Sequence, residues 1–116
     1  MKTSNIIAEL SFDFALQVIK LYKILIENQE YILSKQLLRS GTSIGANVEE
    51  ATAGQTKKDF ITKMSIASKE ARESRYWLKL LDRSKFIDFD YSSYLNEIET
   101  IIRILTKIVK TAQQSI

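Results

Sequence analysis

Apolar residues recur every three or four positions along most of the chain, which is the period of an α-helix that buries one face. One such run has a 4-3-4 spacing and consists of Phe14, Val18, Leu21 and Leu25. The pattern predicts four helices, and they span residues 3–28, 34–53, 57–84 and 89–114. Because short connections between long helices imply antiparallel neighbours, we expect an all-α fold. Residues 1–116 would form a single antiparallel up-down-up-down four-helix bundle.

Polar residues mark where the predicted helices begin. Ser34 can act as the N-cap of the second helix, because a serine hydroxyl accepts a hydrogen bond from an unpaired backbone N–H. Thr56 precedes the third helix and is followed three residues later by Asp59, a spacing that resembles a capping box. The fourth helix is expected to begin near Asp88 or Asp90.

The second helix contains Gly41 and Gly45, each of which costs roughly 1 kcal/mol relative to alanine in a helix interior. We read the helix as continuous because the apolar period keeps its phase across both glycines. The third helix carries small residues in the middle of its apolar stripe, namely Ala67, Ala71 and Ser74. If these residues face the glycines, the two helix axes can approach to about 8 Å. The alternative is a kink or a loop at the glycines.

The first helix carries two neighbouring apolar stripes. The second one lies beside the run described above and consists of Phe12, Ala15, Ile19, Tyr22 and Ile26. Two adjacent stripes make a wide apolar face, which we expect the core of the bundle to cover.

The third helix has a second sector beside its main apolar stripe. This sector is apolar and acidic, and consists of Ile66, Glu70, Glu73, Trp77 and Leu80. It either widens the core or meets another copy of the chain, with Glu70 and Glu73 paired to cations such as Lys63 or Arg39. Tryptophan is enriched at protein interfaces, but it also suits a widened core, so both interpretations stay open.

The remaining sector of the third helix is basic. Within about 120° of arc, at about 100° per residue, lie seven cations and no acid: Lys57, Lys58, Lys69, Arg72, Arg75, Lys79 and Arg83. Such a surface is either an ordinary solvated face or a contact surface for a phosphate backbone. Since Tyr76 is the one aromatic residue in the sector, stacking of single-stranded bases is weakly supported.

The composition narrows the possible chemistry. The chain has 116 residues, 45% of them apolar and 27% charged, which suits one globular domain. It contains no cysteine and no histidine, so disulfides, thiol nucleophiles and histidine-based catalysis or metal binding are excluded. A cysteine-free chain fits the cytoplasm, and no stretch of about 18 apolar residues predicts a membrane span. The net charge of +3 matters only if the cations gather on one face.

Two arrangements that resemble catalytic motifs do not fit. Glu49, Glu50, Glu70 and Glu73 resemble the carboxylates of di-iron bundles, but such sites also need histidine. Residues 40–45 resemble a phosphate-binding loop, but they lack its lysine and follow no strand. We therefore expect no enzyme, no metal and no cofactor, and ion pairs with lysine and arginine are the better explanation for the carboxylates.

One segment is more specific than the helical pattern. Residues 36–51, with the sequence QLLRSGTSIGANVEEA, resemble the signature of the four-helix-bundle proteins encoded by 23S rRNA intervening sequences. The second half of the signature also fits, at Asp59-Phe60, Lys63, Ile66-Ala67, Lys69-Glu70-Ala71, Glu73 and Trp77-Leu78. The resemblance covers about residues 33–81 by motif, and the whole chain by length and helix order.

The resemblance implies a bundle that assembles into a ring, a homopentamer, with a basic surface that binds RNA or DNA. A related branch of the family serves as the accessory protein of reverse transcriptases in diversity-generating retroelements. No catalytic residue can be transferred from the family. The signature positions that shape helix packing and subunit contacts are Arg39, Asn47, Glu50, Lys63, Glu70 and Trp77.

Two functions are therefore expected. The first is a non-enzymatic oligomeric module that contacts nucleic acid through the basic sector of the third helix. The alternative is a protein-binding adaptor, or an accessory subunit of a nucleic-acid enzyme such as a reverse transcriptase, which binds through the face around Ile66, Trp77 and Leu80.

Overall fold

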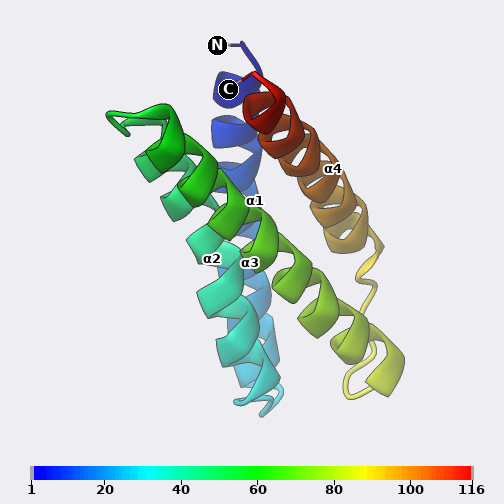
Figure 1. Cartoon of the computed structure of the whole chain (residues 1–116). Coiled ribbons are helices and arrows are strands. Elements are labelled where there is room, and N and C mark those ends of the chain that lie inside the picture. The colour runs from blue at the N-terminus through cyan, green and yellow to red at the C-terminus, as the bar shows by residue number, and fades with distance from the viewer. Residues whose placement is uncertain (1, 116) are drawn as a thin grey trace.

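The computed structural model describes residues 2–115 and consists of four α-helices that pack side by side (Figure 1). They are α1 (Lys2–Glu27), α2 (Leu33–Thr52), α3 (Lys57–Ser84) and α4 (Ser92–Gln114). The chain direction alternates from helix to helix, so that the start of α1 and the end of α4 lie at the same end of the bundle (Figure 1). Each helix contacts two neighbours, and α1 and α3 occupy opposite corners. The predicted all-α four-helix bundle is confirmed.

The core is built from the apolar stripes that the sequence predicts. In α1 four consecutive members of the stripe are fully buried: Phe14, Val18, Leu21 and Leu25. In α3 the buried residues are Met64, Ala67, Ala71, Ser74, Leu78 and Leu81. Full burial of a large apolar side chain contributes about 1.5–3 kcal/mol, so these stripes are what hold the four helices together.

The start of α2 differs from the prediction that Ser34 caps it. The carboxylate of the buried Glu30 accepts hydrogen bonds from three backbone N–H groups, those of Ile32 (3.3 Å), Leu33 (3.0 Å) and Ser34 (2.5 Å). A negative charge at this position also interacts favourably with the helix dipole. The longer side chain of Glu30 reaches back over the first turn, so the hydroxyl of Ser34 is free to donate to the carbonyl of Glu30 (2.6 Å).

The other two helix starts follow their predicted residues more closely. Thr56 caps α3 as predicted, because its hydroxyl accepts a hydrogen bond of 3.0 Å from the backbone N–H of Asp59. The α4 helix begins at Ser92, later than the predicted residue 89. Asp90 accepts hydrogen bonds from the backbone N–H (3.0 Å) and the hydroxyl (2.7 Å) of Ser92, and therefore stays outside the helix.

The two glycines of α2 face α1, and the prediction that they face the small residues of α3 is wrong. The helix is continuous across both, as expected. A Cβ atom added to Gly41 would lie 3.0 Å from the side chain of Val18, and one added to Gly45 would lie 3.4 Å from the hydroxyl of Ser11. Successive residues of a helix point about 100° apart. Gly41 therefore faces α1, whereas the residue before it, Ser40, faces α3.

The small-residue contact between α2 and α3 is made by two serines instead. Ser40 and Ser74 are both buried, and their hydroxyl oxygens are 2.8 Å apart. The glycines therefore allow close approach of α1 to α2, and the serines allow close approach of α2 to α3.

The second apolar stripe of α1 is only partly covered by its neighbours, because Ala15, Tyr22 and Ile26 are half-buried whereas Phe12 is 65% exposed and Ile19 is 38% exposed. Leu16, which is not a member of that stripe, lies beside these two and is 46% exposed. The neighbours of α1 are α2 and α4, and these two helices cover the opposite side of the helix. We call Phe12, Leu16 and Ile19 the α1 outer stripe.

Candidate nucleic-acid interface

The seven predicted cations of α3 lie along its outer surface. Lys57 and Arg83 mark the two ends of the row, and Arg75 is the one member of the set that is half-buried. Three further cations lie exposed on α4, at Arg103, Lys107 and Lys110. We call these ten residues the α3–α4 basic face.

Contacts between side chains join the two helices within this face. A guanidinium nitrogen of Arg72 lies 3.1 Å from the hydroxyl of Thr106, and that hydroxyl donates to the carbonyl of Ile102 (2.7 Å). One turn further on, Arg75 donates a hydrogen bond of 2.6 Å to the carboxylate of Glu99. Cations that are far apart in the sequence therefore belong to one surface.

A shallow groove runs between α3 and α4 inside the basic face. It has a volume of about 290 Å³, and its lining residues are Ser65, Ser68, Arg72, Thr106, Val109, Lys110 and Gln113. Hydroxyls together with cations are the side chains that most often hold phosphate groups in protein–nucleic acid complexes. The groove can therefore accept an anionic oxygen group.

The basic face contains a carboxylate that the sequence pattern of α3 alone does not reveal. Glu99 comes from α4, and its side chain is 55% exposed. The hydrogen bond from Arg75 lowers the pKa of Glu99, and the positive charges of Arg75, Lys79 and Arg103 add to this effect. Glu99 is therefore ionised in the middle of the cations at neutral pH.

The predicted nucleic-acid-binding set did not include the cations of α4. Their spacing carried a usable signal, since Arg103, Lys107 and Lys110 recur after four and three residues and so share one side of the helix. No sequence signal showed which side of α4 would lie next to α3.

The charged members of the second α3 sector pair within the chain. Arg39 of α2 forms ion pairs with Glu70 (3.4 Å) and with Glu73, and the indole N–H of Trp77 donates to Glu73 (3.2 Å). In the same seam between α2 and α3, Lys63 pairs with Glu50 at 2.7 Å.

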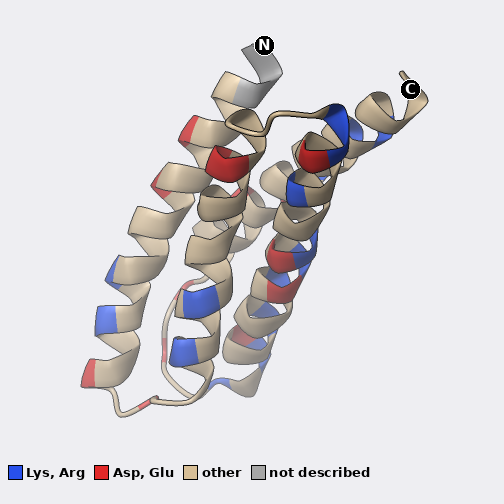
Figure 2. Ribbon diagram, turned by 60° about the vertical axis from the view of Figure 1, so that its left-hand side comes forward, with Lys and Arg blue, Asp and Glu red and all other residues tan. Residues whose placement is uncertain are grey.

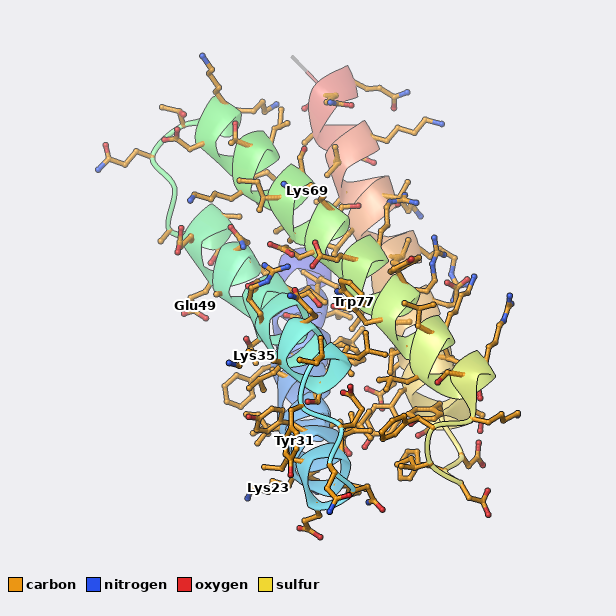
Figure 3. The ribbon with its side chains drawn as sticks, turned by 90° about the horizontal axis from the view of Figure 1, so that it is seen from below. Lys23, Tyr31, Lys35, Glu49, Lys69 and Trp77 are labelled. Carbon is orange, nitrogen blue, oxygen red and sulfur yellow. The ribbon has the colours of Figure 1, made fainter. Side chains whose placement is uncertain are left out.

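The apolar members of that sector lie at the edge of the same seam. Trp77 is half-buried against the core and meets Tyr76 edge-on, with ring centroids 5.2 Å apart. Ile66 is also half-buried, whereas Leu80 is 36% exposed. Figure 3 shows Trp77 and Lys69 on α3 and Lys35 and Glu49 on the neighbouring α2. A role for this sector in subunit contacts stays a prediction.

The three remaining predicted interface positions, Asn47, Gly41 and Gly45, have local structural roles. The side-chain amide of Asn47 donates to the carbonyl of Ser43 (2.8 Å), one turn earlier in α2. Gly41 and Gly45 lie in the seam between α1 and α2, as described above.

Within residues 2–115, no three acidic side chains converge as ligands for a metal ion. The pKa of Tyr91 is raised to about 12 by burial and by the charges of Asp82 and Glu30, so this phenol stays protonated at neutral pH. None of the four described helices combines the length and the apolar character needed to cross a membrane.

The comparisons with known proteins agree with this architecture. A protein of unknown function from the S23 ribosomal protein family of Bacteroides thetaiotaomicron has a crystal structure that matches with a TM-score of 0.89. The two sequences are 45% identical, over 93% of this chain and 98% of the other. No curated protein matches the chain. The sequence model of the 23S rRNA-intervening sequence proteins matches residues 3–107, so nearly the whole bundle is covered and the chain belongs to that family.

Proposed function

We propose that this protein is a non-enzymatic module that binds nucleic acid through the α3–α4 basic face. The observation that supports it most directly is that cations of two helices share one exposed surface, which the Arg72–Thr106 and Arg75–Glu99 contacts join. In Figure 2 basic positions recur along the whole length of α3, with acidic positions between them, whereas on α2 the basic and acidic positions lie toward opposite ends.

The phosphate backbone is the part of the nucleic acid that such a surface fits. The 28 residues of α3 rise about 1.5 Å each, so its row of cations is about 40 Å long. Double-stranded nucleic acid carries a negative charge about every 1.7 Å along its axis, and several phosphates can therefore be contacted at once. Contacts of this kind fix the position of the ligand and do not read its sequence.

Structured RNA is the ligand that we propose to test first. The family takes its name from 23S rRNA, and the matching crystal structure comes from a family named for a ribosomal protein. RNA of this kind would be met in the cytoplasm. Tyr76 is exposed beside the basic face, but one aromatic ring offers little stacking surface for single-stranded bases.

We further propose that the module works as a ring of identical subunits, a pentamer as the family resemblance implies. The α1 outer stripe supports self-association, because three large apolar side chains in a row are exposed on one helix. A ring would repeat the basic face once per subunit, and repeated contacts raise the affinity for a long ligand.

The experiment that tests nucleic-acid binding is a titration of the purified protein onto an RNA hairpin, with duplex RNA and duplex DNA of equal length as comparisons. Each titration is repeated over a series of salt concentrations. The logarithm of the binding constant should fall linearly with the logarithm of the salt concentration, because bound cations on the nucleic acid are released. Affinity that does not change with salt would contradict the proposal.

An adaptor for another protein is the second candidate function, for example an accessory subunit of a reverse transcriptase. The exposed Leu80 beside the half-buried Trp77 favours it, because large side chains of this kind anchor protein interfaces. The test is capture of a purified reverse transcriptase by the wild-type protein and by Trp77→Ala. Equal capture by both would contradict a role for this face.

A further inference from the structure

Three cations surround a single carboxylate in the middle of the α3–α4 basic face. Arg75 donates the hydrogen bond of 2.6 Å to Glu99, and Lys79 and Arg103 lie close enough for their charges to act on the same carboxylate. The pair lies at the surface, because the side chain of Glu99 is 55% exposed and that of Arg75 is 28% exposed. Glu99 therefore neutralises one guanidinium of the face while it stays in contact with solvent.

The neighbouring arginine has a different partner. Arg72 lies one turn before Arg75 on α3, and the group from α4 beside it is the neutral hydroxyl of Thr106. This hydroxyl donates its own proton to the carbonyl of Ile102, so it is oriented to accept from Arg72. Arg72 thus keeps its full positive charge and lines the groove together with Lys110.

A carboxylate and a phosphate are alternative partners for the same guanidinium. Both present two anionic oxygens in one plane, which match the paired N–H groups of arginine. An exposed ion pair between side chains is weak, because solvent screens it and both side chains lose freedom in forming it. Glu99 can therefore turn into solvent when a phosphate approaches Arg75.

We propose that Glu99 competes with a backbone phosphate for Arg75, so that Arg72 is always available for a phosphate and Arg75 is available only after Glu99 is displaced. The inference rests on the proposed function and adds a residue that sets the strength of binding. Glu99 lowers the affinity of the face for every polyanion, and a ligand must supply a phosphate at Arg75 to overcome it.

The test compares Glu99→Gln with Glu97→Gln in titrations of one RNA duplex over a salt series. Both variants remove one negative charge from α4, so they change the net charge equally. Glu97 is a matched control because the charge of Asp13 on α1 acts on it, so it lies on the side of α4 that faces α1 and away from Arg75. We expect Glu99→Gln to bind about three to ten times more tightly at low salt, with a salt slope steeper by about one.

A double variant identifies the group that gains the contact. Arg75→Gln should weaken binding only slightly in the wild-type background, because Glu99 already occupies that guanidinium. In the Glu99→Gln background the same change should remove the whole gain in affinity. Thermal unfolding of each variant separates this role from a structural one, since loss of an exposed pair should hardly move the melting temperature.

The outcomes separate this inference from the proposed function. If the wild-type protein shows no salt-dependent binding to RNA or DNA, both are wrong. If the wild-type protein binds, but Glu99→Gln and Glu97→Gln behave alike, the proposed function stands and the competition by Glu99 is wrong. If Glu99→Gln still raises the affinity for RNA when Arg75→Gln is also present, the proposed competition is wrong as well.

Discussion

The helices α1 and α3 occupy opposite corners of the bundle, and the largest feature on the outer surface of each is different. Both bury a regular apolar stripe between α2 and α4. Outside that stripe, α1 exposes Phe12, Leu16 and Ile19, whereas α3 exposes a row of lysines and arginines. The same packing rule therefore builds both corners, and the outer positions are left free to serve two different kinds of contact.

The charges of the two halves of the chain follow the same division. Residues 1–52 contain five basic residues (Lys or Arg) and six acidic ones (Asp or Glu). Residues 53–116 contain twelve basic residues and eight acidic ones. The positive net charge of the protein thus comes from its second helical hairpin. A polyanion that approaches the bundle is attracted to the corner of α3 and α4.

Charge reversal on α3 should have the largest effect. The triple variant Arg72→Glu, Arg75→Glu and Lys79→Glu should weaken RNA binding about a thousandfold at low salt, because phosphate contacts are lost and repulsion is added. The matched control reverses three exposed cations of the first hairpin, Lys20, Lys23 and Lys35. Electrophoretic or fluorescence titrations of the two variants measure the difference. Equal losses in both would show that net charge alone drives binding.

Removal of the α1 outer stripe should have the next largest effect, on assembly alone. Since each large apolar side chain contributes about 1.5–3 kcal/mol when it is buried, Phe12→Ser with Leu16→Ser should weaken self-association about a hundredfold. Light scattering on wild type and variant measures the subunit number. The unfolding free energy of the single subunit should change by about 0.5 kcal/mol or less, because both side chains are exposed. An unchanged assembly would show that α1 is not the contact.

The inner side of the α1 corner should be sensitive to the size of two glycines. A leucine at Gly41 must displace Val18, whose side chain already lies 3.0 Å from the added Cβ, so Gly41→Leu should destabilise the bundle by about 2 kcal/mol. Gly45→Ala makes a contact of 3.4 Å with Ser11 and gains helix propensity, so it should stabilise by about 0.5 kcal/mol. Urea unfolding of both variants measures these free energies. A stable Gly41→Leu variant would contradict the close packing of α1 on α2.

The smallest predicted effect concerns Glu97, on the side of α4 that faces α1. Burial, together with the charge of Asp13, raises the pKa of Glu97 in the folded protein. A carboxyl with a raised folded pKa lends stability below its unfolded pKa, and this stability is lost as the pH rises through the folded pKa. Glu97→Gln should therefore stabilise the protein by about 0.5 kcal/mol at neutral pH and by nothing in acid.

Urea unfolding at both pH values provides the measurement for Glu97→Gln. The comparison is Glu99→Gln on the same helix: because the pKa of Glu99 is lowered rather than raised, this variant should gain no stability at neutral pH. A gain for Glu97→Gln that is the same in acid and at neutral pH would contradict the role of ionisation.

The core of this protein could be predicted because it depends on local spacing. The buried residues of α3, such as Met64, Leu78 and Leu81, are those whose spacing follows the helical period. The cap at Thr56 was predictable for the same reason, since it depends on residues three positions apart. The cap at Glu30 was not, because a buried carboxylate beside a helix start also requires the surrounding chain to enclose it.

The candidate site depended more on which helices become neighbours. Periodicity gives the angle of Gly41 on its own helix, but the neighbour at that angle is fixed only by the packing of all four helices. For the same reason, the contact of Glu99 with Arg75 could not be predicted, because Glu99 is 24 residues away in the sequence and on another helix. The row of cations on α3 could be predicted, whereas the carboxylate that divides it could not.

The two buried serines between α2 and α3 determine how far one helix can slide along the other. Apolar side chains that repeat every three or four residues would still pack after a shift by one helical turn, about 5.4 Å. Such a shift would separate the hydroxyls of Ser40 and Ser74, now 2.8 Å apart, and leave each with only a backbone carbonyl of its own helix, that of Leu37 for Ser40 and that of Glu70 for Ser74. A net hydrogen bond contributes about 0.5–1.5 kcal/mol, so this hydroxyl pair favours a single axial register for the seam.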